Sequence, residues 1–362
     1  MNSKSLLKKY KDPVNFFNRD LSWVEFNRRV LEEALDPNLP LLEKVKFVSI
    51  FSSNLDEFYM IRVSGLKEQI AANILEPAID GLTPAEQVQQ IEKLLNPMMD
   101  QLYGLWNEQI TPALKENNIQ ILRFHEFNAE EQVKLNEYFT KEIYPVLTPL
   151  AFDPGRPFPY ISNLSLSLAI LVRKPNGESH FARVKVPSIL PRMLQVDDII
   201  NPDKTVDANG AFSAKFIWLE GLIRANLPLL FPGMEIVEAH RFRITRDTDI
   251  ELQEDEADDL LIVIEENLRQ RRFGKVVRIE VSARMPDFML ETLIENLELT
   301  KADVHVSRGP IGLSDVMSLY KLPLHQLKEK PFYPVLPKTF EEEEDIFTVI
   351  KQKDVILHHP YH

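Results

Sequence analysis

The stretch LLEKVKFVSIFSSNLDEFYMIRV, residues 41–63, decides how the first part of the chain folds. Its first half, LLEKVKFVSIF, carries the apolar pattern of a helix. A mostly polar run, SSNLDE at 52–57, then interrupts this pattern, which resumes with Phe58, Ile61 and Val63. The stretch therefore predicts helical structure on both sides of a polar interruption.

The polar interruption has two interpretations. Ser53 and Asp56, like Asn54 and Glu57, have the spacing of a capping box, so one helix could end here and another start. Alternatively, helix N-terminal amides and the amide side chain of Asn54 face a cleft where a phosphate or a base docks. Because helix caps of this kind are common, the residues alone favour the cap.

The remaining residues between 16 and 115 also predict helices. Apolar residues recur at spacings of three and four from Asp20 to Leu35, which is typical of an amphipathic helix. Thr83 before Pro84, with Glu86 three residues further on, is a helix start. Three or four helices of this length indicate an all-α bundle.

From about residue 117 the pattern changes to a mixture of strands and helices. Alternating apolar residues or β-branched runs predict strands at 164–172, 180–187, 215–220, 235–247, 276–283 and 302–307. Two helices are expected between them, at 254–273 and 286–299. Since strands and helices follow no strict βαβ order, we expect an α+β domain.

A proline-rich connector follows this domain, and after it the sequence predicts one helix and one strand, DVILHHPYH at 354–362. The expected organisation is therefore multidomain. It comprises an all-α domain at 1–116, an α+β head domain at 117–322, and the connector with the first elements of a third domain at 323–362.

Composition excludes several classes of protein. The net charge of −13 argues against binding of nucleic acid over the whole surface, so any polyanion would need a locally basic groove. There is no cysteine, which excludes disulfides and thiolate chemistry. The sequence contains neither a phosphate-binding glycine loop nor an apolar stretch long enough to span a membrane. We expect a cytoplasmic protein.

Two further groups of residues invite a chemical interpretation. The helix at 254–273 begins with acids and ends with arginines, which could bind a cation and a phosphate, but this arrangement also complements the helix dipole, and we favour the dipole. His358 and His359 are neighbours, so on a strand they point to opposite faces and do not readily chelate one ion. The remaining histidines do not show the helical spacing of a zinc pair.

Eight long stretches, in their order along the chain, resemble the bacterial polyphosphate kinase family, whose members reversibly transfer the terminal phosphate of ATP to inorganic polyphosphate. They are FFNRDLSWVEFNRRVLEEA, LPLLEKVKFVSIFSSNLDEFYMIRVSGLKEQ, RPFPYISNLSLSLAI, FARVKVPSILPRML, LFPGMEIVEAHRFRITRD, DEADDLLIVIEENLRQRRFG, GPIGLSDVM and DVILHHPYH.

The resemblance implies a helical N-terminal domain, a head domain used in dimerisation, and two C-terminal α/β domains like those of phospholipase D. In the family, the phosphohistidine and the magnesium-site residues lie in those C-terminal domains. DVILHHPYH resembles the first strand of the third domain, so this chain is expected to be an N-terminal fragment, inactive alone and without the catalytic histidine or the magnesium ligands. Relatives more often carry aspartate at the position of His362.

One site of the family falls inside this chain. The asparagine of the SNLDEF motif contacts ATP in the family, and the matching residue is Asn54. The resemblance also implies ATP and ADP, inorganic polyphosphate and Mg²⁺ as ligands of the complete enzyme, and a homodimer formed through the head domain. From the net charge and the short apolar stretches we expect no nucleic-acid partner and no transmembrane segment, and membrane association of the complete enzyme stays open.

Two competing hypotheses belong to other classes. The first is a non-catalytic interaction or regulatory module with the same fold. The second is a metal-dependent hydrolase that uses the histidines at the end of the chain. The residues favour neither over the kinase.

Overall fold

The computed structural model describes residues 11–152, 158–200, 212–248, 274–335, 340, 345–352 and 354–361. The helix predicted at 254–273 lies outside these residues, as does His362. All statements below concern the described residues.

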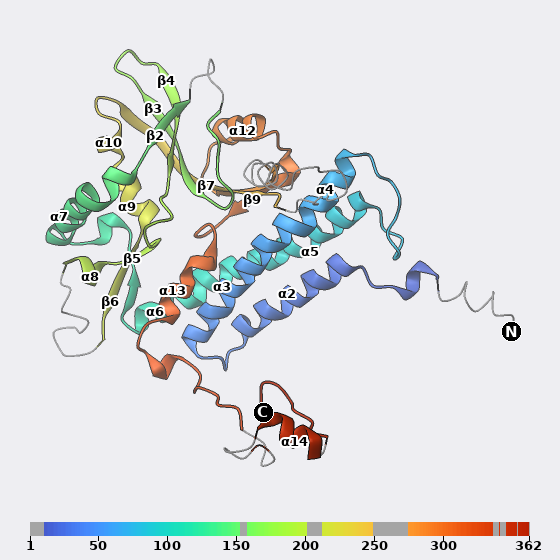
Figure 1. Ribbon diagram of the computed structural model, residues 1–362. Helices are drawn as coiled ribbons and strands as arrows, with labels where there is room; N and C mark the ends of the chain where they lie inside the picture. The colour runs from blue at the N-terminus through green and yellow to red at the C-terminus, as the bar shows by residue number, and fades with distance from the viewer. Residues whose placement is uncertain are drawn as a thin grey trace.

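The N-terminal part is helical, as predicted (Figure 1). Its elements are η1 (Pro13–Asn15), α2 (Arg19–Leu35), α3 (Leu41–Phe58), η2 (Tyr59–Val63), α4 (Ser64–Ala71), α5 (Pro84–Gly104), η3 (Leu105–Ile110) and α6 (Thr111–Glu116). The capping box expected at Thr83 and Glu86 starts α5. Because η2 is one π-helical turn between α3 and α4, the chain from Leu41 to Ala71 is one continuous helical segment.

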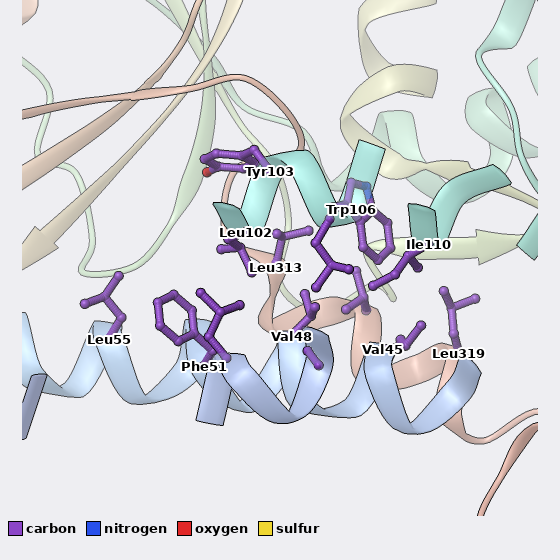
Figure 2. Packing of buried hydrophobic residues seen from close by; sticks show 14 of the residues in the cluster. Val45, Val48, Phe51, Leu55, Leu102, Tyr103, Trp106, Ile110, Leu313 and Leu319 are labelled. Atoms are coloured by element: carbon purple, nitrogen blue, oxygen red, sulfur yellow. The ribbon is translucent and has the colours of Figure 1, made fainter. Parts of the chain in front are cut away.

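The core of this part forms between α3 and the helical segment of α5 and η3. Figure 2 shows Val48 and Phe51 of α3 pointing toward Leu102 and Trp106, and all four side chains are buried. A late segment completes the core: η9 (Leu313–Val316) and α13 (Met317–Tyr320) lie against α3. Residues more than two hundred positions apart therefore share one apolar core.

Two sheets follow. The strands are β1 (Ile119–Ile121), β2 (Pro149–Phe152), β3 (Leu166–Arg173), β4 (Ser179–Lys185), β5 (Met193–Gln195), β6 (Ala214–Trp218), β7 (Glu235–Arg246), β8 (Val276–Ser282) and β9 (Val304–Ser307). The larger sheet has the order β2-β4-β3-β7-β8-β9 and the smaller one β1-β6-β5. Neighbouring strands are antiparallel except for the pairs β8–β9 and β1–β6.

The helices of this second part are short. They are η4 (Phe124–Glu126), α7 (Ala129–Tyr138), η5 (Phe139–Ile143), η6 (Tyr144–Val146), α8 (Val196–Ile200), α9 (Leu219–Ala225), α10 (Leu227–Leu230), α12 (Asp287–Asn296), η8 (Lys301–Asp303) and η10 (His325–Leu327). This arrangement confirms a helical region followed by a mixed domain built on sheets.

Alternation along β3 produces a separate core on each face of the larger sheet. Leu168 and Ile170 belong to the core that contains Leu222 of α9, whereas Ala169 belongs to the core that contains Met289 of α12. Successive side chains of a strand point to opposite faces, so a strand covered on both sides must be apolar at consecutive positions. This explains the continuous apolar run in β3.

The end of the described chain differs from the prediction. The helix is present as α14 (Ile346–Gln352), but residues 354–358 do not form a strand. No strand of the described residues lies beside them to exchange backbone hydrogen bonds. Instead, the Val335 amide donates to the Tyr361 carbonyl at 2.9 Å. The strand predicted at 354–358 is therefore not formed in this structure, and the third domain stays a prediction.

Candidate functional site

Asn54 lies in the interior of α3, four residues before that helix ends at Phe58. The α-helix starts at Leu41, after Pro40, and runs through the whole polar stretch without a break. The prediction that one helix ends and another starts here is therefore wrong. The polar side chains do not cap the helix: Asn54 bonds to Asn27 of α2, and Asp56 pairs with Arg243 of β7.

Two hydrogen bonds fix the orientation of the Asn54 amide. The Asn54 Nδ2 group donates to Asn27 Oδ1 at 3.1 Å, and Asn27 Nδ2 donates to the Phe51 carbonyl at 3.2 Å. A backbone carbonyl only accepts hydrogen bonds, so the fully buried Asn27 must turn its amino group toward Phe51 and its oxygen toward Asn54. This leaves the carbonyl oxygen and the second N–H of Asn54 without a hydrogen bond to any described residue.

The adjacent face of α3 lines a cleft of about 430 Å³. Ser53 and Glu57 belong to this cleft, together with Arg192, Arg243 and other residues of the head domain, whereas Asn54 does not line it. The structure thus separates residues that the sequence places side by side. Asn54 lies where α2 and α3 meet, whereas Ser53 and Glu57 face the head domain.

A buried network of charges joins α3 to the larger sheet. Arg243 Nη1 of β7 donates to Asp56 Oδ1 and to Glu280 Oε2, both at 2.7 Å. Arg278 Nη2 of β8 lies 3.1 Å from Glu280 Oε1, and its Nη1 lies 3.7 Å from Asp56 Oδ1. None of the four side chains is more than 8% exposed. Two arginines and two carboxylates therefore neutralise one another out of contact with water.

This network determines the protonation of Glu280. Burial alone would raise the pKa of Glu280, but the charges of Arg278 and Arg243 lower it to about 2. Burial also lowers the pKa of Arg243, and the opposing effect of Asp56 and Glu280 is larger, so the pKa is raised. Glu280, Arg243 and Arg278 are consequently charged near neutral pH.

The network continues to His305 of β9. The Tyr59 hydroxyl donates to Glu92 Oε1 at 2.7 Å and lies 3.3 Å from His305 Nε2. The Arg278 guanidinium lies 4.5 Å from the centre of the Tyr59 ring. Burial lowers the pKa of His305 to about 3, and the charge of Arg278 adds to this effect. His305 is therefore neutral at physiological pH.

Sequence reasoning missed these charged residues. Arg243, Arg278 and Glu280 lie in stretches that alternate as strands do, and such charges ordinarily face solvent. The signal present in the sequence is that each charge stands between apolar neighbours in a strand, as Arg243 does between Phe242 and Ile244. For their partner Asp56, the sequence offers only the spacing of a helix cap.

No group of three or more His, Asp or Glu side chains in the described ranges could hold a metal ion. The centroids of the His358 and Tyr361 rings lie 5.0 Å apart.

Within the described ranges, no helix is both long and apolar enough to cross a membrane.

Two family models match the chain. The one described as polyphosphate kinase N-terminal domain matches residues 16–122, and the one described as polyphosphate kinase middle domain matches residues 130–319. The chain belongs to the polyphosphate kinase family. The matched domains are the N-terminal and middle ones, in agreement with the resemblance seen in the sequence.

The relatives extend this result over nearly the whole chain. A protein of Chlorobaculum tepidum named polyphosphate kinase 1 is 49% identical over 361 residues, which cover 97% of this chain and 50% of the relative. The polyphosphate kinase of Thermosynechococcus vestitus is 43% identical over 377 residues, and the match covers 97% of this chain and 51% of the relative. The chain thus spans about half the length of the curated relatives it matches.

A solved structure shares the fold. The crystal structure of polyphosphate kinase from Porphyromonas gingivalis matches 96% of this chain and 47% of its own, with a TM-score of 0.76 and 26% identity. This agreement supports the arrangement of helical and sheet-containing parts around the buried network.

Replacing Arg243 by Met should strongly destabilise the protein. The substitution preserves much of the volume but leaves Asp56 and Glu280 buried with less compensating charge, and breaking a buried pair in this way costs about 3–5 kcal/mol. Urea unfolding measures the loss. Arg173→Met is the matched control, because its ion pair with Glu235 is exposed and should contribute about 0–1 kcal/mol. Equal losses in the two variants would show that the network does not hold the domains together.

Stability should also fall on acidification from pH 7 to about pH 5, and His305 should account for part of the fall. The pKa of His305 is lowered in the folded protein, so over this window the unfolded chain takes up a proton that the folded chain does not. Melting temperatures of His305→Gln should depend less on pH there, because glutamine does not titrate. The exposed His325→Gln serves as control and should behave as the unmodified chain. An unchanged pH profile in His305→Gln would contradict the prediction.

Proposed function

We propose that this chain is the N-terminal half of an enzyme that reversibly transfers the terminal phosphate of ATP to inorganic polyphosphate through a phosphohistidine. The observation that carries the proposal is the match of relatives named polyphosphate kinase along 96–97% of the chain, together with both family models in their order. Since those relatives are about twice as long, the chemistry of the whole protein is assigned to both halves together.

In this proposal Asn54 contributes to the ATP site. Its oriented amide offers one acceptor and one donor from a half-buried position, which is the pair of functions needed to recognise a polar edge of a nucleotide base. Asn27 acts as a positioning residue, because its own hydrogen bond to Phe51 determines which way the Asn54 amide points.

The catalytic histidine and the magnesium site are assigned to the other half, in the phospholipase D-like domains that the family resemblance implies. Phosphoryl transfer requires a positioned nucleophile and cations on the transferred phosphate. Accordingly, residues 1–362 alone are proposed to be inactive and to supply a part of the nucleotide site and a dimer surface.

In the complete protein, Asn54→Ala should raise the KM for ATP by about two- to tenfold, since the loss of one hydrogen bond costs about 0.5–1.5 kcal/mol. Initial rates of polyphosphate formation over a range of ATP concentrations measure the effect. Thermal unfolding of the same variant separately reports the loss of the bond to Asn27. Ser53→Ala, which removes a neighbouring polar group from the same helix, is the control.

An unchanged KM in Asn54→Ala would contradict the assignment of this residue to the ATP site. A complete protein that forms no polyphosphate from ATP would contradict the proposed function itself.

The head domain, residues 117–322, is proposed to form a homodimer. Sedimentation of the 1–362 chain at tens of micromolar should then give a mass near twice the 42.0 kDa of the monomer. The whole chain is the appropriate sample, because the core of the helical part includes Leu313 and Leu319 and removal of the helices would expose them. A monomer at this concentration would count against the surface proposed here.

A further inference from the structure

A cavity of about 870 Å³ lies where the helical part meets the sheets, distant in the sequence from Asn54. Its walls come from η3, from the connection between β1 and η4, from α9 and β7, and from the residues that follow β8 and β9. Several separate segments of the chain therefore converge on one space.

Arginines dominate the charge of this cavity. Five of its lining residues are arginines, and the lining contains one acid, Glu220. The arginines are Arg123, Arg224, Arg241, Arg284 and Arg308. This excess of positive charge stands in a chain whose net charge is −13. An accidental surface distribution in such a chain would favour acids.

The described residues neutralise only a part of this charge. Arg241 lies 3.8 Å from Glu220, which also pairs with Arg192 at 2.8 Å, and Arg308 lies 3.2 Å from Asp100. The other three arginine side chains have no ion pair with any described residue.

The pKa of Arg241 reflects the same excess of positive charge in the cavity. Burial lowers its pKa, and the positive charges of Arg192 and Arg224 lower it further, although Glu220 acts in the opposite direction. Like charges gathered in a partly buried space repel one another, and an anion that binds among them relieves the repulsion.

We propose that this cavity binds a segment of linear inorganic polyphosphate. Each internal phosphate unit carries a negative charge, and the planar guanidinium group can donate two parallel hydrogen bonds to one phosphate. Arginines spread over several walls suit a chain of phosphates better than a single terminal phosphate. The assignment rests on the proposed function, which makes polyphosphate a ligand of the protein, and adds a binding site for it in this half.

Binding of polyphosphate to the 1–362 chain tests the proposal without any catalytic step. Calorimetric titration with inorganic polyphosphate of one defined length should show binding that weakens as salt is raised, because the contacts are ionic. The variant with Arg224→Gln and Arg284→Gln should lose about tenfold or more in affinity for polyphosphate. The reason is that hydrogen bonds to charged groups are among the stronger ones. Both side chains are exposed, so the fold should persist, which circular dichroism checks.

The matched control carries Arg19→Gln and Arg29→Gln, two exposed arginines of α2 outside the cavity. It removes the same charge and should bind as the unmodified chain does. Equal weakening in both double variants, an absence of binding, or equal competition by a single-stranded oligonucleotide would each overturn the proposal. None of these results would affect the assay of ATP-dependent synthesis by the complete protein, so the two failures are distinguishable.

Discussion

The docking of the helical part onto the larger sheet depends on the buried charges of Asp56, Arg243, Arg278 and Glu280. A charge removed from water is tolerated only beside an opposite charge and with its hydrogen bonds made. Here one carboxylate comes from α3 and the other three groups from β7 and β8. The charges of the sheet are therefore compensated only when the helix is in place. Apolar packing would permit several nearby arrangements, but this network favours one.

The chain after β9 is adapted to this network. Gly312 has a φ of +66°, and a Cβ atom there would lie 3.2 Å from Arg243 Nε. Its carbonyl accepts a hydrogen bond from Arg192 Nη1 at 2.7 Å. Directly after this close approach, Leu313 enters the core of the helical part. A left-handed glycine thus lets the backbone pass beside the buried arginine and return to the helices.

The sequence predicted the elements that have strong periodicity and missed what depends on tertiary contact. The long helices and the strands β3, β4, β7 and β8 follow from apolar spacing. The strands β1 and β5 have three residues each, which is too short for a period to be visible. Asp56 illustrates the second limit, because its spacing from Ser53 is that of a cap. Its actual role, pairing with Arg243, depends on β7 packing against α3.

The sequence also predicted only a part of the candidate site. Resemblance proposed Asn54, but the direction of its amide depends on Asn27 of α2, which lies 27 positions away in the sequence and meets α3 only in the folded chain. The arginine-lined cavity has no sequence signal, because its five arginines are scattered between positions 123 and 308. Folding gathers them at one junction while acids prevail over the rest of the chain.

At physiological ionic strength, charges separated by more than about 8 Å are largely screened. A polyanion close to this cavity therefore responds to the local positive charge more than to the net charge of −13, and an acidic protein can in this way offer one favourable place to a highly negative ligand.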